Sequence, residues 1–415
     1  MHLQRNWIIL LICSVLRLSS ANGQTRTLDY YLEQALKNNP QLNDFRNQVQ
    51  STALDSLKIR AGRKPQVNML GQVLIAPVVN GYGYDNTVTN SGNYELLVGV
   101  SQNVFNKNIL APQYENAHLQ GLSAGNSAVQ TEHELKRNIT SQYIGVYSDI
   151  LQIGFAKETM KLLDEESQYL KQLVEKGVYK AFDYTSFLMI RQSQEIAISQ
   201  QEFQYRSDLY ALNLICGITD TSRPALAAPP VQSSSTVGLS SSRFLNSFHI
   251  DSIQISNRKL LTGANYKPRL SWFADGGVLG SQPSVLYRNF GTSFGLNFSL
   301  PLYDGKQKQL EYKKMDLAEN TRTSYQQFFK KQYTQEISAI LTELDDNNAL
   351  IGQVNKQLKL SEEQIRFGKT QLNIGALPIS DFILAVKNYK EVKNNLQVLM
   401  IRQMLLTNEF NYWNW

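Results

Sequence analysis

Proline is absent from three long stretches of the chain: between Pro112 and Pro224, between Pro301 and Pro378, and over residues 379–415. Because proline breaks the interior of a helix, these stretches leave room for very long helices. Their residues are mostly helix formers, and apolar side chains recur at three- and four-residue spacing. The pattern predicts long helices that pack side by side in the manner of coiled coils.

Elsewhere the apolar residues alternate with polar or small ones, which predicts strands with one apolar face. Four segments show this pattern, over residues 67–75, 94–100, 270–278 and 290–300. Each is about as long as a tilted membrane strand needs to be. In the fourth segment we expect one face to contact lipid, through Phe290, Phe294, Leu296 and Phe298. Residues 77–93 and 280–289 are rich in Gly, Asn, Ser and Tyr, which predicts hairpin loops.

Two motifs recur at an offset of 198, because residues 101–106 match 299–304 and residues 177–183 match 375–381. The chain is therefore predicted to contain two structural repeats. A basic start, an apolar run and a small-residue cleavage site predict an exported protein with a cleaved signal peptide. The predicted organisation is a signal peptide (1–23), a first repeat (24–217), a linker (218–242) and a second repeat (243–415), the repeats forming one intertwined domain.

Four strands cannot close a membrane barrel, since the smallest closed barrels use about eight strands and an open edge leaves backbone groups unsatisfied in hydrocarbon. Several chains must then share one barrel. A helix over residues 304–350 would reach roughly 70 Å and would project out of the membrane. The predicted fold class is mainly α with membrane β: a long α-helical coiled-coil tunnel plus four strands per chain in a shared transmembrane β-barrel.

Gly177 and Gly375 are interpreted as helix-terminating glycines, followed by Asp183 and Asp381 as N-caps of the next helices. On this interpretation the two glycines interrupt the long helices at an equatorial collar, a belt around the middle of the helical tunnel. The alternative is that either aspartate lines the lumen or binds a ligand.

The turns at the periplasmic tips are predicted near residues 150–155 and 345–352, halfway along the proline-free spans. Asp345 and Asp346 could then form an acidic ring at the aperture, the alternative being an ordinary solvated turn. The other tip offers apolar groups at a solvent-facing turn, which predicts a contact with a partner protein through Gln152, Ile153, Gly154 and Phe155.

No enzyme motif is complete in this sequence. His133 and Glu134 begin an HExxH-like string, but Arg137 stands where the second zinc ligand should be. No phosphate loop or nucleophile motif is found, so we expect no enzyme activity, no cofactor and no metal site. The formal net charge is +6, and +4 without the two arginines of the signal peptide, which is too mild to indicate nucleic-acid binding.

Four motifs stand out by their order along the chain, over residues 28–40, 300–305, 373–375 and 381–385. Through these motifs the sequence resembles the TolC-like outer-membrane efflux protein family. It implies a homotrimer with a twelve-stranded barrel in the outer membrane of a Gram-negative bacterium, with helices projecting into the periplasm. It also implies outer-membrane lipid, a periplasmic adaptor protein and an inner-membrane transporter as partners. The chain would then be the passive exit duct of a tripartite efflux or type I secretion system.

An alternative from another class is a periplasmic coiled-coil scaffold or adaptor without a membrane barrel. It accounts for the long helices, but it leaves four strands of membrane length unexplained. Extraction distinguishes the two, because a barrel needs detergent and a scaffold does not.

Overall fold

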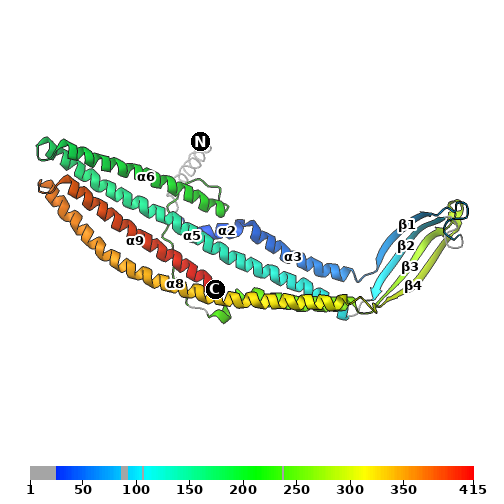
Figure 1. Ribbon diagram of the computed structural model, residues 1–415. Helices are drawn as coiled ribbons and strands as arrows, with labels where there is room; N and C mark the ends of the chain where they lie inside the picture. Colours follow the sequence, from blue (N-terminus) through cyan, green and yellow to red (C-terminus); the bar gives the residue numbers. More distant parts are fainter. Residues whose placement is uncertain (1–24, 86–91, 105–106, 236–237) are drawn as a thin grey trace, which may run out of the picture. The chain divides into compact units, whose positions relative to one another are not determined.

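The computed structural model describes residues 25–85, 92–104, 107–235 and 238–415, so the predicted signal peptide lies outside the described residues (Figure 1). The chain forms two compact units. The first comprises Met1–Leu42, Gln130–Arg243 and Lys330–Trp415, and the second comprises Asn43–Val129 and Phe244–Phe329. Each unit therefore contains residues from both predicted repeats.

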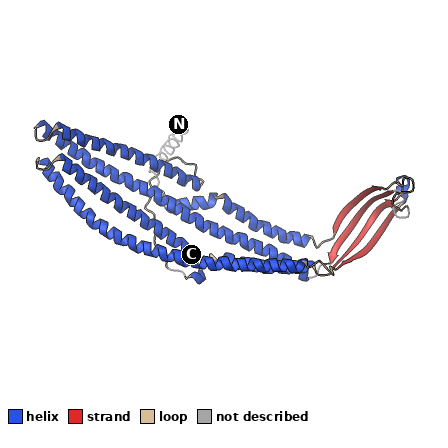
Figure 2. Cartoon of the chain, viewed as in Figure 1, coloured by secondary structure: helices blue, strands red, loops and turns tan. Residues whose placement is uncertain are grey.

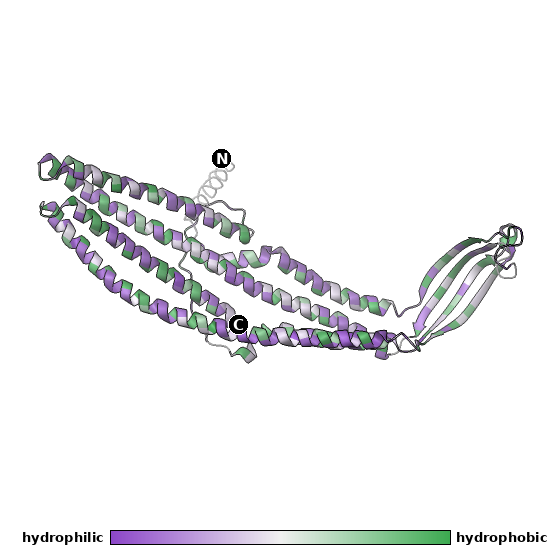
Figure 3. Cartoon of the chain, viewed as in Figure 1, coloured by the Kyte–Doolittle hydropathy of each residue, from purple (hydrophilic) through white to green (hydrophobic). Residues whose placement is uncertain are grey.

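Seven α-helices are present in the described residues (Figure 2). They are α2 (Leu28–Asn38), α3 (Pro40–Ala61), α5 (Lys107–Glu175), α6 (Ala181–Ile215), α7 (Leu245–Asn265), α8 (Gln307–Asn373) and α9 (Ile379–Trp413). Two short 3₁₀ turns, η1 (Leu239–Ser241) and η2 (Pro283–Arg288), complete the helical elements. None of the described helices has an apolar stretch long enough to cross a bilayer, and polar residues recur along every long helix in Figure 3.

The four predicted strands are confirmed as β1 (Gln66–Ile75), β2 (Gly92–Val104), β3 (Arg269–Gly280) and β4 (Phe290–Ser299). They form one antiparallel sheet in the second unit, in the order β1-β2-β3-β4. The first repeat supplies β1 and β2, and the second repeat supplies β3 and β4. The two halves join through the pairing of β2 with β3, in which Val100 lies opposite Ala274.

The repeat is visible in the helices that follow the strands. Helices α6 and α9 each contain 35 residues, and both their first and their last residues are 198 positions apart. Their predecessors α5 and α8 contain 69 and 67 residues. At 1.5 Å per residue each of these two helices is about 100 Å long.

The long helices do not reverse at residues 150–155 and 345–352, so the predicted positions of the tip turns are wrong. Both segments lie inside continuous helices, α5 and α8. Turn-forming residues are abundant in the second segment, but packing holds them helical: Asn347 is buried and its amide donates to a backbone carbonyl of α9 at 3.0 Å. The chain reverses instead at Gly177 and Gly375.

Side-chain amides show how the helices of the first unit neighbour one another. Gln194 of α6 and Gln397 of α9 both donate to carbonyl oxygens of α5, at 3.0 and 3.2 Å. Asn347 makes the equivalent bond from α8 to α9. Helix α6 also contacts α9, because Lys390 of α9 donates to the side-chain oxygen of Gln194 at 2.8 Å. Helices α6 and α8 nevertheless each carry a row of exposed apolar side chains, which marks an open flank.

In the second unit the helices are connected in the same way. Buried Asn257 of α7 donates to the carbonyl oxygen of Pro112 in α5 at 3.0 Å, and Ser252 of α7 donates to Glu319 of α8 at 3.2 Å. Helix α3 approaches α5 so closely that a Cβ on Gly121 would lie 2.7 Å from the hydroxyl of Thr52. Helices α3 and α8 are thus the outermost helices of this unit.

One core cluster of the first unit joins α2 to α5 and α6, and it also holds the linker between the repeats. Its buried members are Leu28, Tyr31, Ala35, Ile139, Tyr143, Val146, Leu209, Leu212, Cys216 and Leu226. The hydroxyl of Tyr143 lies 3.1 Å from the carbonyl oxygen of Arg26 and 2.7 Å from that of Ala227. Fully burying a large apolar side chain contributes about 1.5–3 kcal/mol, so this cluster is a main source of stability in the unit.

Candidate functional site

The sheet of the second unit has one continuous apolar face. Residues opposite each other in neighbouring strands share a face, and the register places Val67, Val100, Ala274 and Phe294 in one row across the sheet. The four side chains predicted to contact lipid in β4 all lie on this face. Their exposed fractions are 72% for Phe290, 90% for Phe294, 71% for Leu296 and 67% for Phe298.

The opposite face of the sheet is mainly polar. It carries Glu95 and Asp275, together with the small residues Gly295, Ser293 and Asn297 of β4. The hydroxyl of Ser293 donates to the carboxylate of Asp275 at 2.7 Å. One sheet thus presents an apolar surface to one side and a polar surface to the other.

Both edges of this sheet lack a partner strand among the described residues. The edges are β1, from the first repeat, and β4, from the second. An exposed strand edge is a row of backbone donors and acceptors that can pair with another chain.

The outer helices also carry exposed apolar side chains. On α6, every seventh residue from Phe182 to Tyr210 is an exposed apolar one, which is the spacing of a coiled-coil seam. These residues are Phe182 (79% exposed), Met189 (68%), Ile196 (51%), Phe203 (65%) and Tyr210 (47%). Near the end of α8, Leu360 and Phe367, followed by Ile374 just beyond the helix, repeat the same spacing at 67%, 59% and 73% exposure.

In the second unit the outer helices continue this pattern. Leu54 and Leu57 of α3 are 64% and 58% exposed, and Leu310 and Leu317 of α8 are 61% and 66% exposed. Within each unit, one apolar edge comes from the first repeat and the other from the second. Exposed apolar patches of this extent mark interaction surfaces.

Gly177 and Gly375 lie at the reversals of the two helix pairs, with φ of +74° and +78°. At the first turn the amide of Gly177 donates to Val174, and the amide of Val178 donates to Leu173, both at 2.9 Å. The second turn repeats these two bonds around Gly375, at 3.1 and 2.9 Å. This is the Schellman arrangement, which requires a left-handed residue that glycine adopts without strain. The predicted helix ends are therefore present, but they are the reversals themselves and not breaks within a helix pair.

The predicted N-caps are wrong. Lys180 and Pro378 occupy the N-cap positions of α6 and α9, and Asp183 and Asp381 are the third residues of these helices. The backbone is extended at both N-cap residues, and neither residue caps its helix with a side-chain hydrogen bond. The aspartates remain favourable there because the positive end of the helix dipole lies in the first turn.

The two turns are packed on each other within the chain. The hydroxyl of Tyr179 lies 2.9 Å from the carbonyl oxygen of Leu372 and 2.7 Å from that of Leu377. Next to the turns, residues of α5, α6, α8 and α9 form a second core cluster. Its buried members are Leu163, Leu170, Phe187, Leu372, Ile379, Phe382 and Val386. The same region holds Glu166, which is fully buried and lies 3.0 Å from the ammonium of Lys369.

The residues predicted to act at the tips lie elsewhere. Asp345 and Asp346 are exposed on the side of α8, far along the helix from its terminus. Gln152, Ile153 and Gly154 lie within α5, and Phe155 is buried against the ring of Tyr389 at 5.8 Å. The turn on which the adaptor contact was predicted is absent at these residues.

Asp149 of α5 has an unusual environment. It is partly buried beside Asp208 of α6, and one of its carboxylate oxygens is buried without a hydrogen-bond partner. Burial and the neighbouring carboxylate of Asp208 raise the pKa of Asp149 to about 7. A sequence search for acidic pairs could not find this one, because 59 positions separate the two residues.

His133 is part of an aromatic stack and not of a metal site. Its ring lies 5.0 Å from the ring of Tyr412 and 4.1 Å from that of Trp415, nearly parallel to both. Burial lowers its pKa, which favours the neutral form. The described residues contain no group of three or more potential metal ligands.

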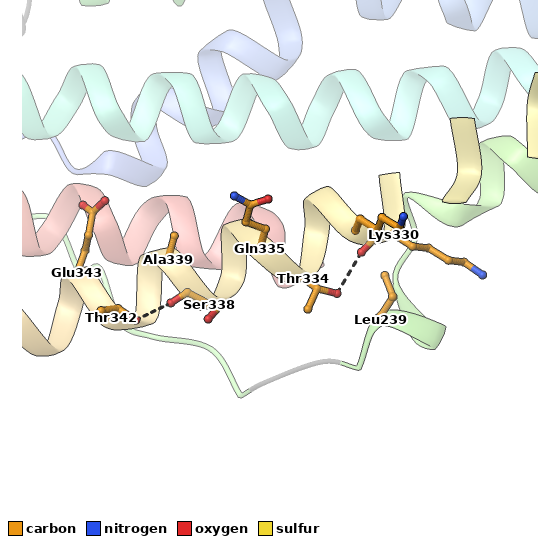
Figure 4. A pocket seen from close by; sticks show the side chains of 9 residues that line it. Leu239, Lys330, Thr334, Gln335, Ser338, Ala339, Thr342 and Glu343 are labelled. Atoms are coloured by element: carbon orange, nitrogen blue, oxygen red, sulfur yellow. Dashed lines mark hydrogen bonds between the residues drawn. The ribbon is translucent and has the colours of Figure 1, made fainter. Parts of the chain in front are cut away.

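An open groove runs along α8 beside Leu239 of the linker (Figure 4). The hydroxyls of Thr334 and Thr342 donate back to carbonyl oxygens of their own helix, those of Lys330 and Ser338, at 3.0 Å each. These two hydroxyls are therefore occupied within their own helix. The candidate functional surfaces are the sheet faces, the open edges and the turns.

Known structures share the fold of this chain. CusC, whose structures are described with transmembrane channel formation, is 14% identical with a TM-score of 0.73 and covers 94% of this chain and 92% of its own. VceC, an outer membrane protein from Vibrio cholerae, is 14% identical with a TM-score of 0.73, covering 93% and 95%. The open state of the MtrE outer membrane channel from Neisseria gonorrhoeae is 13% identical with a TM-score of 0.72, covering 93% and 88%.

No protein-family model and no curated protein matches the sequence. The predicted resemblance to the TolC-like family is nevertheless confirmed at the level of the fold, over almost the whole chain. The predicted fold class, with long tunnel helices and four strands per chain, is confirmed with it.

Proposed function

We propose that this chain is one protomer of an outer-membrane exit duct, a passive conduit that carries substrates from the periplasm or an inner-membrane pump to the exterior. The proposed location is the outer membrane of a Gram-negative bacterium, with the helices in the periplasm. The proposed systems are tripartite efflux and type I secretion.

The observation that carries the proposal is the pairing of open edges. Each unit has exposed edges from both repeats: β1 and β4 of the sheet and α3 and α8 in the second unit, and α6 and α8 in the first unit. Within each unit, a first-repeat edge of one copy can therefore meet a second-repeat edge of the next copy. Such head-to-tail contacts generate a ring when the rotation closes, and the proposed ring is a homotrimer with twelve strands.

The two faces of the sheet support the same function. In a closed barrel the apolar face with Phe294 would meet lipid, and the polar face with Asp275 would line the lumen. Interior polar residues hold water in membrane barrels wide enough to form channels. A chain of this kind needs no catalytic group, because the energy for transport comes from its partners.

The proposed partners are a periplasmic adaptor protein and an inner-membrane transporter. The helix reversals at Gly177 and Gly375 are the proposed docking end, in place of the mid-helix residues predicted from the sequence. Two observations support this choice: the reversals are where the long helices end, and Val178 and Ile374 beside them are 48% and 73% exposed.

The test is the mass and heat-modifiability of the protein extracted from outer membranes. We expect a detergent-requiring trimer whose compact electrophoretic mobility is lost on heating. Phe294→Arg places a charge on the lipid face, at a cost of about 2–4 kcal/mol near the bilayer midplane, and should abolish the heat-modifiable form. Asn297→Arg adds the same charge to the polar face of the same strand and should leave it intact. A monomer soluble without detergent would overturn the proposal in favour of the periplasmic scaffold.

A further inference from the structure

The end of the sheet that adjoins the helices has an unusual charge. Four segments flank the strands there, over residues 60–66, 103–104 with 107–108, 265–270 and 299–308, and we name them the basic collar. They contain eight basic residues and one acid: Arg60, Arg63, Lys64, Lys107, Lys267, Arg269, Lys306 and Lys308, with Asp304. Among the described residues, the opposite end of the sheet (75–85, 92 and 279–291) contains one acid and one base, Asp85 and Arg288.

Within the described part of the chain, the charge of the collar cations is not neutralised by a carboxylate, although Lys267 and Arg269 donate to the neutral oxygens of Asn108 and Asn265 and Lys308 lies over the ring of Tyr266. Six of the eight are exposed, and Lys267 and Lys308 are half-buried. Where the structure describes ion pairs, none involves a collar cation, although cations elsewhere form pairs such as Lys259 with Asp316 and Arg402 with Glu343.

The single collar carboxylate is already engaged. Asp304 accepts the backbone amides of Lys308 and Lys306, at 2.7 and 2.9 Å, and the hydroxyl of Tyr266. These hydrogen bonds lower the pKa of Asp304, and the bond from the Lys308 amide has the largest effect. The carboxylate therefore stays ionised at the start of α8. Asp304 therefore serves the backbone and leaves the positive charge of the surrounding side chains largely uncompensated.

The collar lies where a bilayer would end. Strands β1 and β4 contain ten residues each, which is the length of a tilted membrane strand, and the collar residues directly adjoin them. Lys and Arg at such a boundary extend their charged ends to the head groups while their stems stay near hydrocarbon. Trp272, near the same end of the apolar face, is an aromatic residue of the type enriched at membrane interfaces.

We propose that the basic collar binds the phosphate groups of anionic phospholipids in the bilayer leaflet on the helix side of the barrel. This inference rests on the proposed function, because it requires the sheet to stand in a membrane. Each Lys or Arg near an anionic surface contributes about 1 kcal/mol of attraction, and a trimer would bring three collars into one ring. The collar thus fixes the depth of the barrel in the membrane and selects the lipids that surround it, without any role in substrate passage.

The test uses the full-length protein purified in detergent and native mass spectrometry, with phosphatidylglycerol and phosphatidylcholine as competing lipids. The wild-type trimer should retain phosphatidylglycerol in preference, and salt should weaken this preference. A collar variant, Arg63→Gln with Lys64→Gln, Lys267→Gln and Arg269→Gln, should lower the preference by about tenfold or more.

A matched control removes the same charge from the side of α8, with Lys330→Gln, Lys331→Gln, Lys356→Gln and Lys359→Gln, and should retain the preference. Equal losses in the two variants, or a wild-type trimer that binds both lipids equally, would overturn the collar proposal. Loss of the phosphatidylglycerol preference in inorganic phosphate but not in sodium chloride of equal ionic strength would also overturn it, because a free phosphate ion and not a bilayer lipid would then be the specific ligand. A monomeric mass would refute the shared duct instead, so the two failures are distinguishable. If the fourfold collar variant does not fold, the double variant Arg63→Gln with Lys64→Gln, in which both side chains are exposed, should still lower the preference, and an unchanged preference would overturn the proposal.

Discussion

The helix reversals at Gly177 and Gly375 have the same backbone conformation but different surroundings, which yields a quantitative prediction. A Cβ at Gly177 would have no heavy atom within 4 Å, whereas a Cβ at Gly375 would lie 2.6 Å from Cγ1 of Val178. Gly177→Ala should therefore cost only the left-handed strain, about 1–2 kcal/mol. Gly375→Ala adds the displacement of Val178, so we expect a total of about 3 kcal/mol.

Asparagine separates strain from contact, because its side chain tolerates the left-handed region. Gly177→Asn should be nearly neutral, while Gly375→Asn should remain destabilising. Val178→Ala should relieve Gly375→Ala, with a coupling energy of about 1–3 kcal/mol in the double-mutant cycle. The assay is amide hydrogen exchange at the turns, where the protected amides of Val178 and Ala376 report local opening. Equal costs at the two glycines, or no coupling to Val178, would refute the reasoning.

Three further predictions concern buried groups of the first unit. The pKa of Asp149 in the folded state is raised to about 7, so the folded state binds the proton more tightly than the unfolded state does, and stability should fall as pH rises from about 4 to 7. Asp149→Asn should remove this fall, as measured by thermal melts at pH 5 and pH 8. Lys369→Met leaves the carboxylate of Glu166 buried without a counter-charge and should cost about 3 kcal/mol, much more than Glu166→Gln, as measured by the shift in melting temperature. Burial raises the pKa of the Cys216 thiol to about 12, so a maleimide should label it only after unfolding; rapid labelling of the folded protein would contradict the structure.

The strands and the repeat could be predicted from the sequence because their signals are local or exact. The alternation from Phe290 onward has a period that only a strand with two different faces satisfies. The offset of 198 also predicts equivalent helix ends in the two repeats, because Gly177 and Gly375 occupy equivalent left-handed positions.

The positions of the reversals could not be predicted from the sequence, because residue preferences compete with packing. Gly352 and the polar residues before it resemble a turn, but an isolated helical glycine costs only about 1 kcal/mol. Contacts such as that of Asn347 with α9 offset this cost. The Asp149–Asp208 pair and the open edges also depend on which helices become neighbours, which no local pattern specifies.

The contacts between the two turns limit how the proposed duct could move. Tyr179 bridges to Leu372 and Leu377 across the repeats, and Val178 lies against Gly375. The two reversals of one chain therefore have few independent degrees of freedom. In a trimer the helical ends would behave mechanically as three blades and not six, and a change of aperture would have to occur by sliding at the seams between chains.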